Sequence, residues 1–175
     1  MAPGSRRTSP EVEHLEQLAR EWYEYQGYFV RQDFWVGLES DGSYECELDV
    51  VAFHPLHRHI VQIEPGFDLL PAEEKERHFR VKFDAGRKYL HRMFGPPAGL
   101  HVEQIALVAV RSCGERRTIG GGRVLLVSEL VTEILRRLAP LDPCSAPIPE
   151  QWPLIRTLQW AAGSHAAPLS ESAIR

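Results

Sequence analysis

The sequence predicts a mixed α/β fold in which a central sheet has helices on both faces. Three short segments rich in β-branched and aromatic residues precede a long charged helix, and a strongly apolar segment follows that helix. This order, a meander of strands followed by a helix and a further strand, is typical of mixed sheets. A chain of 175 residues, 43% of them hydrophobic, is long enough to form one domain with its own core.

The chain is expected to begin with a polar segment and a helix. Residues 1–9 are small and polar, and we expect them to be disordered. A helix is expected from Pro10 to about Gln26, because Ser9 suits the cap, Pro10 suits the first turn and apolar residues recur at helical spacing. Gly27 is expected to end this helix.

Three strands are expected next, joined by short polar turns. The expected strands are residues 28–36, 44–53 and 60–64. The polar loop 54–59 has hairpin length, so the second and third strands are expected to be antiparallel. Pro65 and Gly66 are expected to interrupt or end the third strand.

The second half of the chain is expected to alternate helices with apolar strands. We expect helices at 72–92, 129–138 and 151–162, and strands at 102–110 and 124–127. Residues 111–122 form a basic, glycine-rich loop, and the tail 163–175 is expected to be loose. Residues 10–162 are therefore expected to form a single domain.

Composition excludes several classes of protein. The net charge of −4 gives no global basic footprint, so a nucleic-acid role would depend on a local patch. The three cysteines include no CxxC pair, which argues against a zinc ribbon and favours the reducing cytoplasm. The polar start of the chain has no apolar segment of the kind found in signal peptides, so we expect no secretory signal, and no apolar run is long enough to span a membrane.

Two acidic residues interrupt strands that are otherwise apolar. Asp49 lies within the run 47–53, and Glu64 follows the run 60–63. A buried carboxylate is costly unless it is paired or binds a cation. Side chains alternate along a strand, so Gln62 shares a face with Glu64, and in a suitable hairpin register Asp49 shares it too. Two converging carboxylates suit Mg2+, with Mn2+ as an alternative. The competing interpretation is that both acids are solvated at strand ends or paired with nearby bases.

The arrangement of the whole chain adds a family resemblance. The segments that carry it are Leu15-Glu16-Gln17-Leu18, Gln26-Gly27-Tyr28-Phe29-Val30, Glu47-Leu48-Asp49-Val50-Val51-Ala52 and Ile60-Val61-Gln62-Ile63-Glu64. Their order resembles the PD-(D/E)XK, or restriction-endonuclease-like, nuclease superfamily over roughly residues 10–140. Residues 77–89 also resemble a bacterial subgroup of nuclease-like proteins of unassigned role. The resemblance implies a restriction-endonuclease-like mixed central sheet flanked by helices, and Mg2+-dependent hydrolysis of phosphodiesters.

The resemblance assigns roles to individual residues. It implies that Asp49 and Glu64 bind the metal, that Glu16 on the first helix completes the site, and that Gln62 supports it. The family pattern places a lysine two residues after the second acid, where this chain has Gly66. Some members supply the lysine from the next helix, and we expect Lys82 to take that role. The competing interpretation is that Lys82 is a solvated surface residue.

Basic residues are the candidates for DNA contact. The following side chains are expected to form a phosphate-binding rim: Arg80, Arg87, Lys88, Arg111, Arg116, Arg117 and Arg123. The competing interpretation for those on the helix is that they are solvated and interact favourably with its dipole.

Two functions of different classes follow from these patterns. The first is a Mg2+-dependent nuclease or nuclease-like domain that acts on DNA. The second is a catalytically inactive binding or assembly module with the same fold, favoured by Gly66 and by the acidic pI near 6.1. A less favoured reading is an unrelated α/β protein with solvated acids. A nuclease of this size without a specificity domain often engages two strands as a homodimer, so a dimer is expected.

Overall fold

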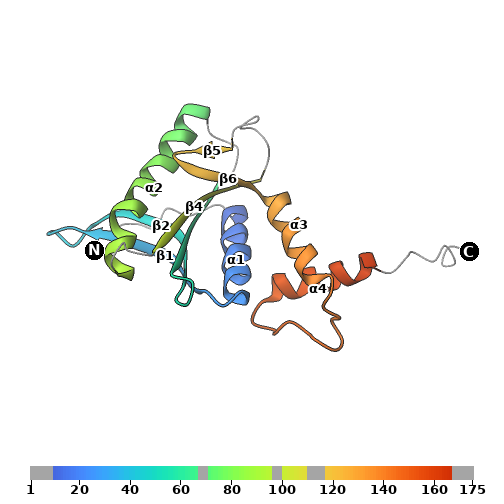
Figure 1. The fold of residues 1–175 in the computed structure, drawn as a ribbon. Coiled ribbons are helices and arrows are strands. Elements are labelled where there is room, and N and C mark those ends of the chain that lie inside the picture. The colour runs from blue at the N-terminus through green and yellow to red at the C-terminus, as the bar shows by residue number, and fades with distance from the viewer. Residues whose placement is uncertain (1–9, 67–70, 96–99, 110–116, 167–175) are drawn as a thin grey trace, which may run out of the picture. The chain divides into compact units, whose positions relative to one another are not determined.

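A computed structural model describes residues 10–66, 71–95, 100–109 and 117–166 (Figure 1). It confirms the predicted fold class, because a six-stranded mixed sheet is combined with four helices among the described residues. The chain forms two compact units, one up to Val127 and one from Ser128, which are described separately below. The N-terminal segment 1–9, expected to be disordered, lies outside the described residues, as does the tail beyond Ala166.

The elements follow the predicted order, with one additional short strand. They are α1 (Pro10–Tyr25), β1 (Phe29–Leu38), β2 (Tyr44–His54), β3 (His59–Gly66), α2 (Ala72–Phe94), β4 (His101–Val108), β5 (Thr118–Ile119), β6 (Gly122–Leu126), α3 (Val127–Leu138) and α4 (Pro153–Ala166). Strand β5 was not predicted, and α4 continues to Ala166, beyond the expected end at residue 162.

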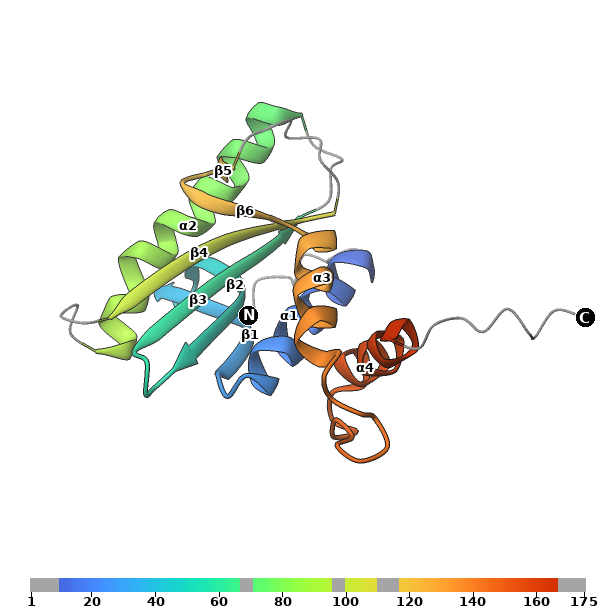
Figure 2. The ribbon, with the colours of Figure 1, turned by 45° about the vertical axis from the view of Figure 1, so that its right-hand side comes forward.

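The sheet combines a meander with parallel strands. Its strand order is β1-β2-β3-β4-β6-β5. The first three strands are antiparallel neighbours, β3 and β6 both run parallel to β4, and β5 pairs antiparallel with β6. The parallel β3–β4 pair requires a crossover connection, and α2 supplies it (Figure 2).

Pro65 and Gly66 were expected either to interrupt the third strand or to end it, and the structure shows the second: β3 is not interrupted at Pro65 and ends at Gly66. Strand β3 continues through both residues, which pair with Leu107 and Val108 of β4. On its other side, the β2–β3 ladder ends at the Val50–Ile63 pair. Pro65 therefore lies where only one side of the strand is in a ladder, which is where proline is tolerated.

Strand β2 changes its alternation around Asp49. Leu48 and Val51 belong to the same buried cluster although they are three residues apart, whereas a regular strand would point them to opposite faces. On the neighbouring strand, Asp33 lies between the paired residues Gln32 and Phe34 and has φ of 50°. The sheet is thus irregular at the position of Asp49.

Helices α1 and α2 cover opposite faces of the sheet (Figures 1 and 2). Helix α2 packs Ala85 and Leu90 against residues such as Phe34 and Ile60, and packs Phe79 and Phe83 against β4 and β5. Helix α1 packs on β1, β2 and β3. Strand β3 is consequently buried on both faces, so that its acidic and amide side chains are enclosed by protein.

The second unit contains most of α3 and all of α4. Gln159 of α4 is fully buried and accepts a hydrogen bond from Ile148 N at 2.9 Å. Its Nε2 donates to Ala146 O at 2.8 Å, which ties the connecting segment to α4. Within the described part of the chain, no helix has the length and apolar character needed to cross a membrane.

Candidate functional site

Two carboxylates and one ammonium meet beside the end of the β2–β3 ladder. Lys82 Nζ of α2 lies 2.9 Å from Glu64 Oε2 of β3 and also contacts Asp49 Oδ1 of β2. The same Glu64 oxygen accepts a hydrogen bond from Asp49 N at 3.3 Å. The two acids that interrupt apolar strands in the sequence therefore converge on one cation, and neither is paired with its own arginine.

Burial sets the electrostatics of this group. Glu64 is fully buried, and burial together with the charge of Asp49 raises the pKa of its carboxyl group well above the ordinary value. Burial alone would lower the pKa of Lys82, but the charges of Glu64 and Asp49 outweigh it and raise that pKa. The lysine therefore stays protonated, and its charge offsets only one of the two neighbouring carboxylates.

Glu16 of α1 lies close enough to Asp49 and Lys82 for their charges to affect its pKa. Its side chain is 6% exposed, and burial, together with the charges of Asp49 and Asp33, raises its pKa to about 7 against the opposing effect of Lys82. A carboxyl group with such a pKa is about half protonated at neutral pH, and a bound cation would displace the proton.

Two further acids nearby were missed in the sequence. Burial and the charge of Asp33 raise the pKa of Glu47, and Asp49 acts on it in the same direction. Asp33 is exposed and stands opposite the irregularity in β2. The sequence of β1 gave no signal for Asp33, because an acid at an exposed strand position is common and does not by itself indicate a site.

Gln62 was expected to support the site and lies in contact with it. It is fully buried, and its Nε2 donates to Glu64 Oε1 at 2.7 Å and to Lys82 O at 3.0 Å. One amide thus holds the second acid and also bonds to the helix that carries the lysine. Gln104 of β4, which was not singled out in the sequence, donates to Gln62 Oε1 at 2.7 Å.

The structure gives a steric reason for the absence of a lysine at position 66. A Cβ atom added to Gly66 would lie 2.8 Å from Cζ of Phe79, a fully enclosed ring of α2. Residue 66 therefore has no room for a long side chain while Phe79 fills this space. The ammonium beside the acids comes instead from Lys82, one turn further along the same helix.

The donor atoms present suit a hard divalent cation. Two carboxylate oxygens from adjacent strands already contact one cation, and Glu16 adds a third acid nearby. Oxygen ligands of this kind are preferred by Mg2+ and Mn2+. Among the side chains that the structure describes, no three histidine, cysteine or acidic groups already form a complete metal-binding cluster. A cation would thus share the acids with Lys82 or displace its ammonium.

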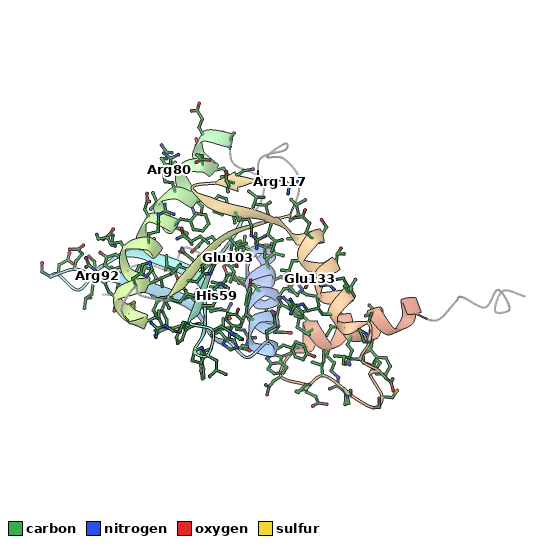
Figure 3. All side chains as sticks on the ribbon, in the orientation of Figure 1. His59, Arg80, Arg92, Glu103, Arg117 and Glu133 are labelled. Carbon is green, nitrogen blue, oxygen red and sulfur yellow. The ribbon has the colours of Figure 1, made fainter. Side chains whose placement is uncertain are left out.

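The expected phosphate-binding residues that the structure describes lie on the surface, and most of them are paired with acids. Arg80 pairs with Glu76, Arg87 with Asp84, Lys88 with Glu45, and Arg123 with Glu103. Arg117 is exposed, whereas Arg111 and Arg116 lie outside the described residues. Figure 3 shows Arg80 on α2 and Arg117 next to the short strand β5. Exposed ion pairs of this kind are weak, so a phosphate group can compete for these cations.

Comparison with known proteins adds no family assignment. No model of a known protein family matches the chain, and a search of curated proteins found no significant match.

Proposed function

We propose that this chain is a Mg2+-dependent nuclease, or nuclease-like domain, that hydrolyses phosphodiesters in DNA. The observation that carries the proposal is the convergence of Asp49 and Glu64, from adjacent strands, on the single ammonium of Lys82. The element order and the resemblance to the PD-(D/E)XK superfamily favour the same conclusion. The antiparallel meander followed by a helical crossover to a parallel strand is compatible with that superfamily's sheet.

Each residue has a distinct part in the proposed reaction. A water oxygen attacks the phosphorus atom, and the bond from phosphorus to one ester oxygen breaks. One proton of the water passes through solvent to the leaving oxygen, which departs as a hydroxyl group, and the other is released to solvent. Asp49 and Glu64 would hold the divalent ion, and Glu16 would complete its oxygen ligands. A bound divalent ion supplies positive charge that neutralises the phosphate. The ammonium of Lys82 would position the water and stabilise negative charge on the phosphate oxygens.

The wider setting of the proposed activity rests on the surface and the composition. The exposed arginines on α2 and at β6 would contact the phosphate backbone, which needs no sequence-specific readout. A homodimer would allow two strands of DNA to be engaged. Three cysteines without a paired motif fit a cytoplasmic location.

One observation favours a second candidate function, a catalytically inactive binding module. Lys82 already contacts both carboxylates, so its ammonium can serve as the permanent counter-charge of the pair. A site of this kind needs no metal, and the fold would be retained for binding or assembly. The two candidate functions differ in whether a divalent ion replaces the ammonium of Lys82 beside the two carboxylates.

A cleavage assay tests the first candidate against the second. The wild type, Asp49→Ala and Lys82→Met would be incubated with linear and circular DNA in Mg2+, in Mn2+ and in EDTA. We expect metal-dependent cleavage by the wild type and its loss in both variants. Asp41→Ala, which alters an exposed acid in the β1–β2 turn, is the matched control and should cut normally. Cleavage by Asp49→Ala at the wild-type rate would overturn the proposal, and inactivity of the wild type would favour the binding module.

A further inference from the structure

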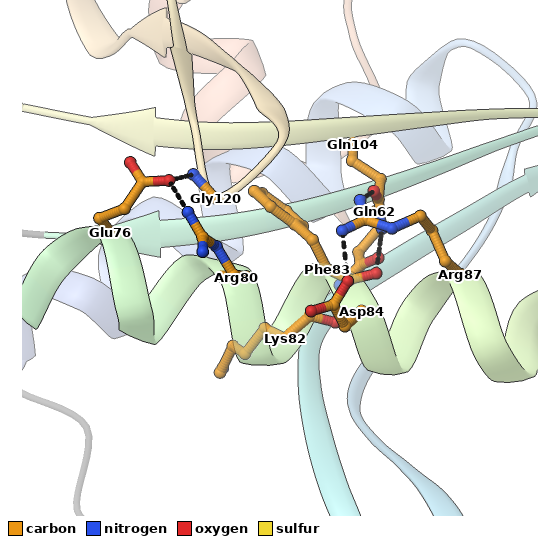
Figure 4. A network of polar contacts seen from close by, with 9 residues as sticks. All are labelled: Gln62, Glu76, Arg80, Lys82, Phe83, Asp84, Arg87, Gln104 and Gly120. Atoms are coloured by element: carbon orange, nitrogen blue, oxygen red, sulfur yellow. Dashed lines mark hydrogen bonds and ion pairs between the residues drawn. The ribbon is translucent and has the colours of Figure 1, made fainter.

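A chain of hydrogen bonds leads from the surface of α2 to the buried acid of the site, and Figure 4 shows its part from Arg87 through Gln104 to Gln62. The guanidinium of Arg87 donates to Gln104 Oε1, and Gln104 Nε2 donates to Gln62 Oε1 at 2.7 Å. Gln62 Nε2 then donates to Glu64 Oε1 at 2.7 Å. Gln62 and Gln104 are register partners in the parallel β3–β4 ladder, so the two amides lie side by side.

The two ends of this chain fix the direction of every bond in it. The guanidinium of Arg87 only donates hydrogen bonds, and the ionised carboxylate of Glu64 and the backbone carbonyl of Lys82 only accept them. If the amide of Gln62 were turned over, its oxygen would face two acceptors, the carboxylate of Glu64 and the carbonyl of Lys82. The amide of Gln104 is held in the same way, because its Nε2 also donates to Phe83 O at 2.8 Å. Unsatisfied buried acceptors make the reversed arrangement unfavourable.

The side-chain amides of Gln62 and Gln104 also determine how closely α2 approaches the sheet. A Cβ atom added to Gly86 would lie 1.8 Å from Gln62 Oε1 and 3.0 Å from Gln104 Nε2. The missing side chain lets the helix approach closely enough for both glutamines to bond with its carbonyl groups. The carbonyl that Gln62 contacts belongs to Lys82, so these contacts fix where that residue stands relative to Glu64.

We propose that Gln104 is a positioning residue for the candidate site. It holds the amide of Gln62, which turns the carboxylate of Glu64 so that Oε2 faces Asp49 and Lys82. Gln104 touches none of the proposed reacting atoms and acts only through Gln62. The inference rests on the proposed function, since it concerns the geometry of the acids that would bind the metal.

Calorimetric titration with Mn2+ alone tests this role in the full chain. We expect Gln104→Met to lower the Mn2+ affinity at least about tenfold, as is typical when a residue that orients a metal ligand is removed. The matched control is Gln159→Met, which removes a buried hydrogen-bonded glutamine in the other compact unit and should leave the affinity unchanged. Equal Mn2+ affinity in wild type and Gln104→Met would overturn the inference.

A second variant covers the case in which Gln104→Met does not fold. Arg87 is exposed, and Arg87→Met removes the donor that fixes the amide of Gln104 without opening the core. It is expected to weaken Mn2+ binding less than Gln104→Met but in the same direction. An unchanged affinity in Arg87→Met would then count against the inference.

A double-mutant cycle without metal separates failure of the inference from failure of the proposed function. If the wild type binds no Mn2+, the metal proposal fails, and the cycle alone decides the role of Gln104. Urea unfolding would give the unfolding free energies of Gln104→Met, of Lys82→Met and of the double variant. Arg87→Met would replace Gln104→Met in this cycle if Gln104→Met does not fold. Because the amides position the ion pair, we expect a non-additive effect on the unfolding free energy. Additive effects would overturn the positioning role.

Discussion

Lys82 Nζ lies 2.9 Å from Glu64 Oε2, and this pair joins the crossover helix α2 to β3, the last strand of the meander. The acid is fully buried, and the lysine side chain is 15% exposed. Asp49 completes the group from the neighbouring strand. A single ammonium facing two carboxylates leaves the group negatively charged when both acids are ionised. This charge balance has measurable consequences for stability and for metal binding.

Removal of the lysine should destabilise the protein. Lys82→Met leaves two carboxylates without their cation, one of them fully buried, and we expect a loss on the order of 3 kcal/mol in unfolding free energy. Added Mn2+ should recover part of this loss, because the metal replaces the missing charge. Thermal unfolding with and without Mn2+ measures both effects. No recovery in Mn2+ would contradict a metal site at these acids.

Glu16 should make the stability depend on pH. Its pKa is raised from 4.5 to about 7 in the folded protein, so its contribution to stability is present below pH 4.5 and is lost as the pH rises through 7. Glu16→Gln imitates the protonated carboxyl group and should remove this loss, which is on the order of 3 kcal/mol. Melting curves from pH 4.5 to 8 should therefore be flatter for the variant. The exposed Glu39→Gln variant should behave as wild type, and identical profiles for Glu16→Gln and wild type would refute the assignment.

Gly86 should not tolerate alanine, although alanine normally favours a helix. The added Cβ would collide with the amide of Gln62, and we expect Gly86→Ala to lose about 1–3 kcal/mol. Gly163→Ala on α4 is the matched control, since its Cβ would lie at an ordinary 3.6 Å from Pro143. The control should gain up to about 1 kcal/mol from helix propensity. If both variants gain stability in urea unfolding, the close contact at Gly86 is wrong.

A lysine at position 66 should not substitute for Lys82. The ring of Phe79 occupies the space next to Gly66, so Gly66→Lys should destabilise the fold by about 1–3 kcal/mol. The double variant Gly66→Lys with Lys82→Met should cut DNA no better than Lys82→Met alone. Recovered cleavage in the double variant would show that Phe79 gives way and that position 66 can supply the ammonium.

The elements of the fold could be predicted because their signals are local. The helical period before Gly27 and the apolar runs around Asp49 and Glu64 need no knowledge of the rest of the chain. The strand β5 was missed because two residues carry no period, and they form a strand only by pairing with β6. The continuation of β3 through Pro65 was missed because it depends on where the ladder with β2 ends.

The candidate site was predictable only in part. Asp49 and Glu64 stood out as charges within apolar strands, a pattern that is unfavourable without a partner. Gln104 carried no such signal, because an amide in a strand becomes significant only when the β3–β4 register places it beside Gln62. The acid Asp33 was likewise hidden, since its effect on Glu16 depends on how α1 lies against the sheet.

Mn2+ titration of the purified wild type and of Asp49→Asn tests most directly whether these acids form a divalent-cation site. The substitution keeps the shape of the side chain and removes one carboxylate, so circular dichroism should confirm that the variant is folded. We expect saturable Mn2+ binding by the wild type and none by Asp49→Asn. A wild type that binds no Mn2+, or a variant that binds it equally well, would contradict it.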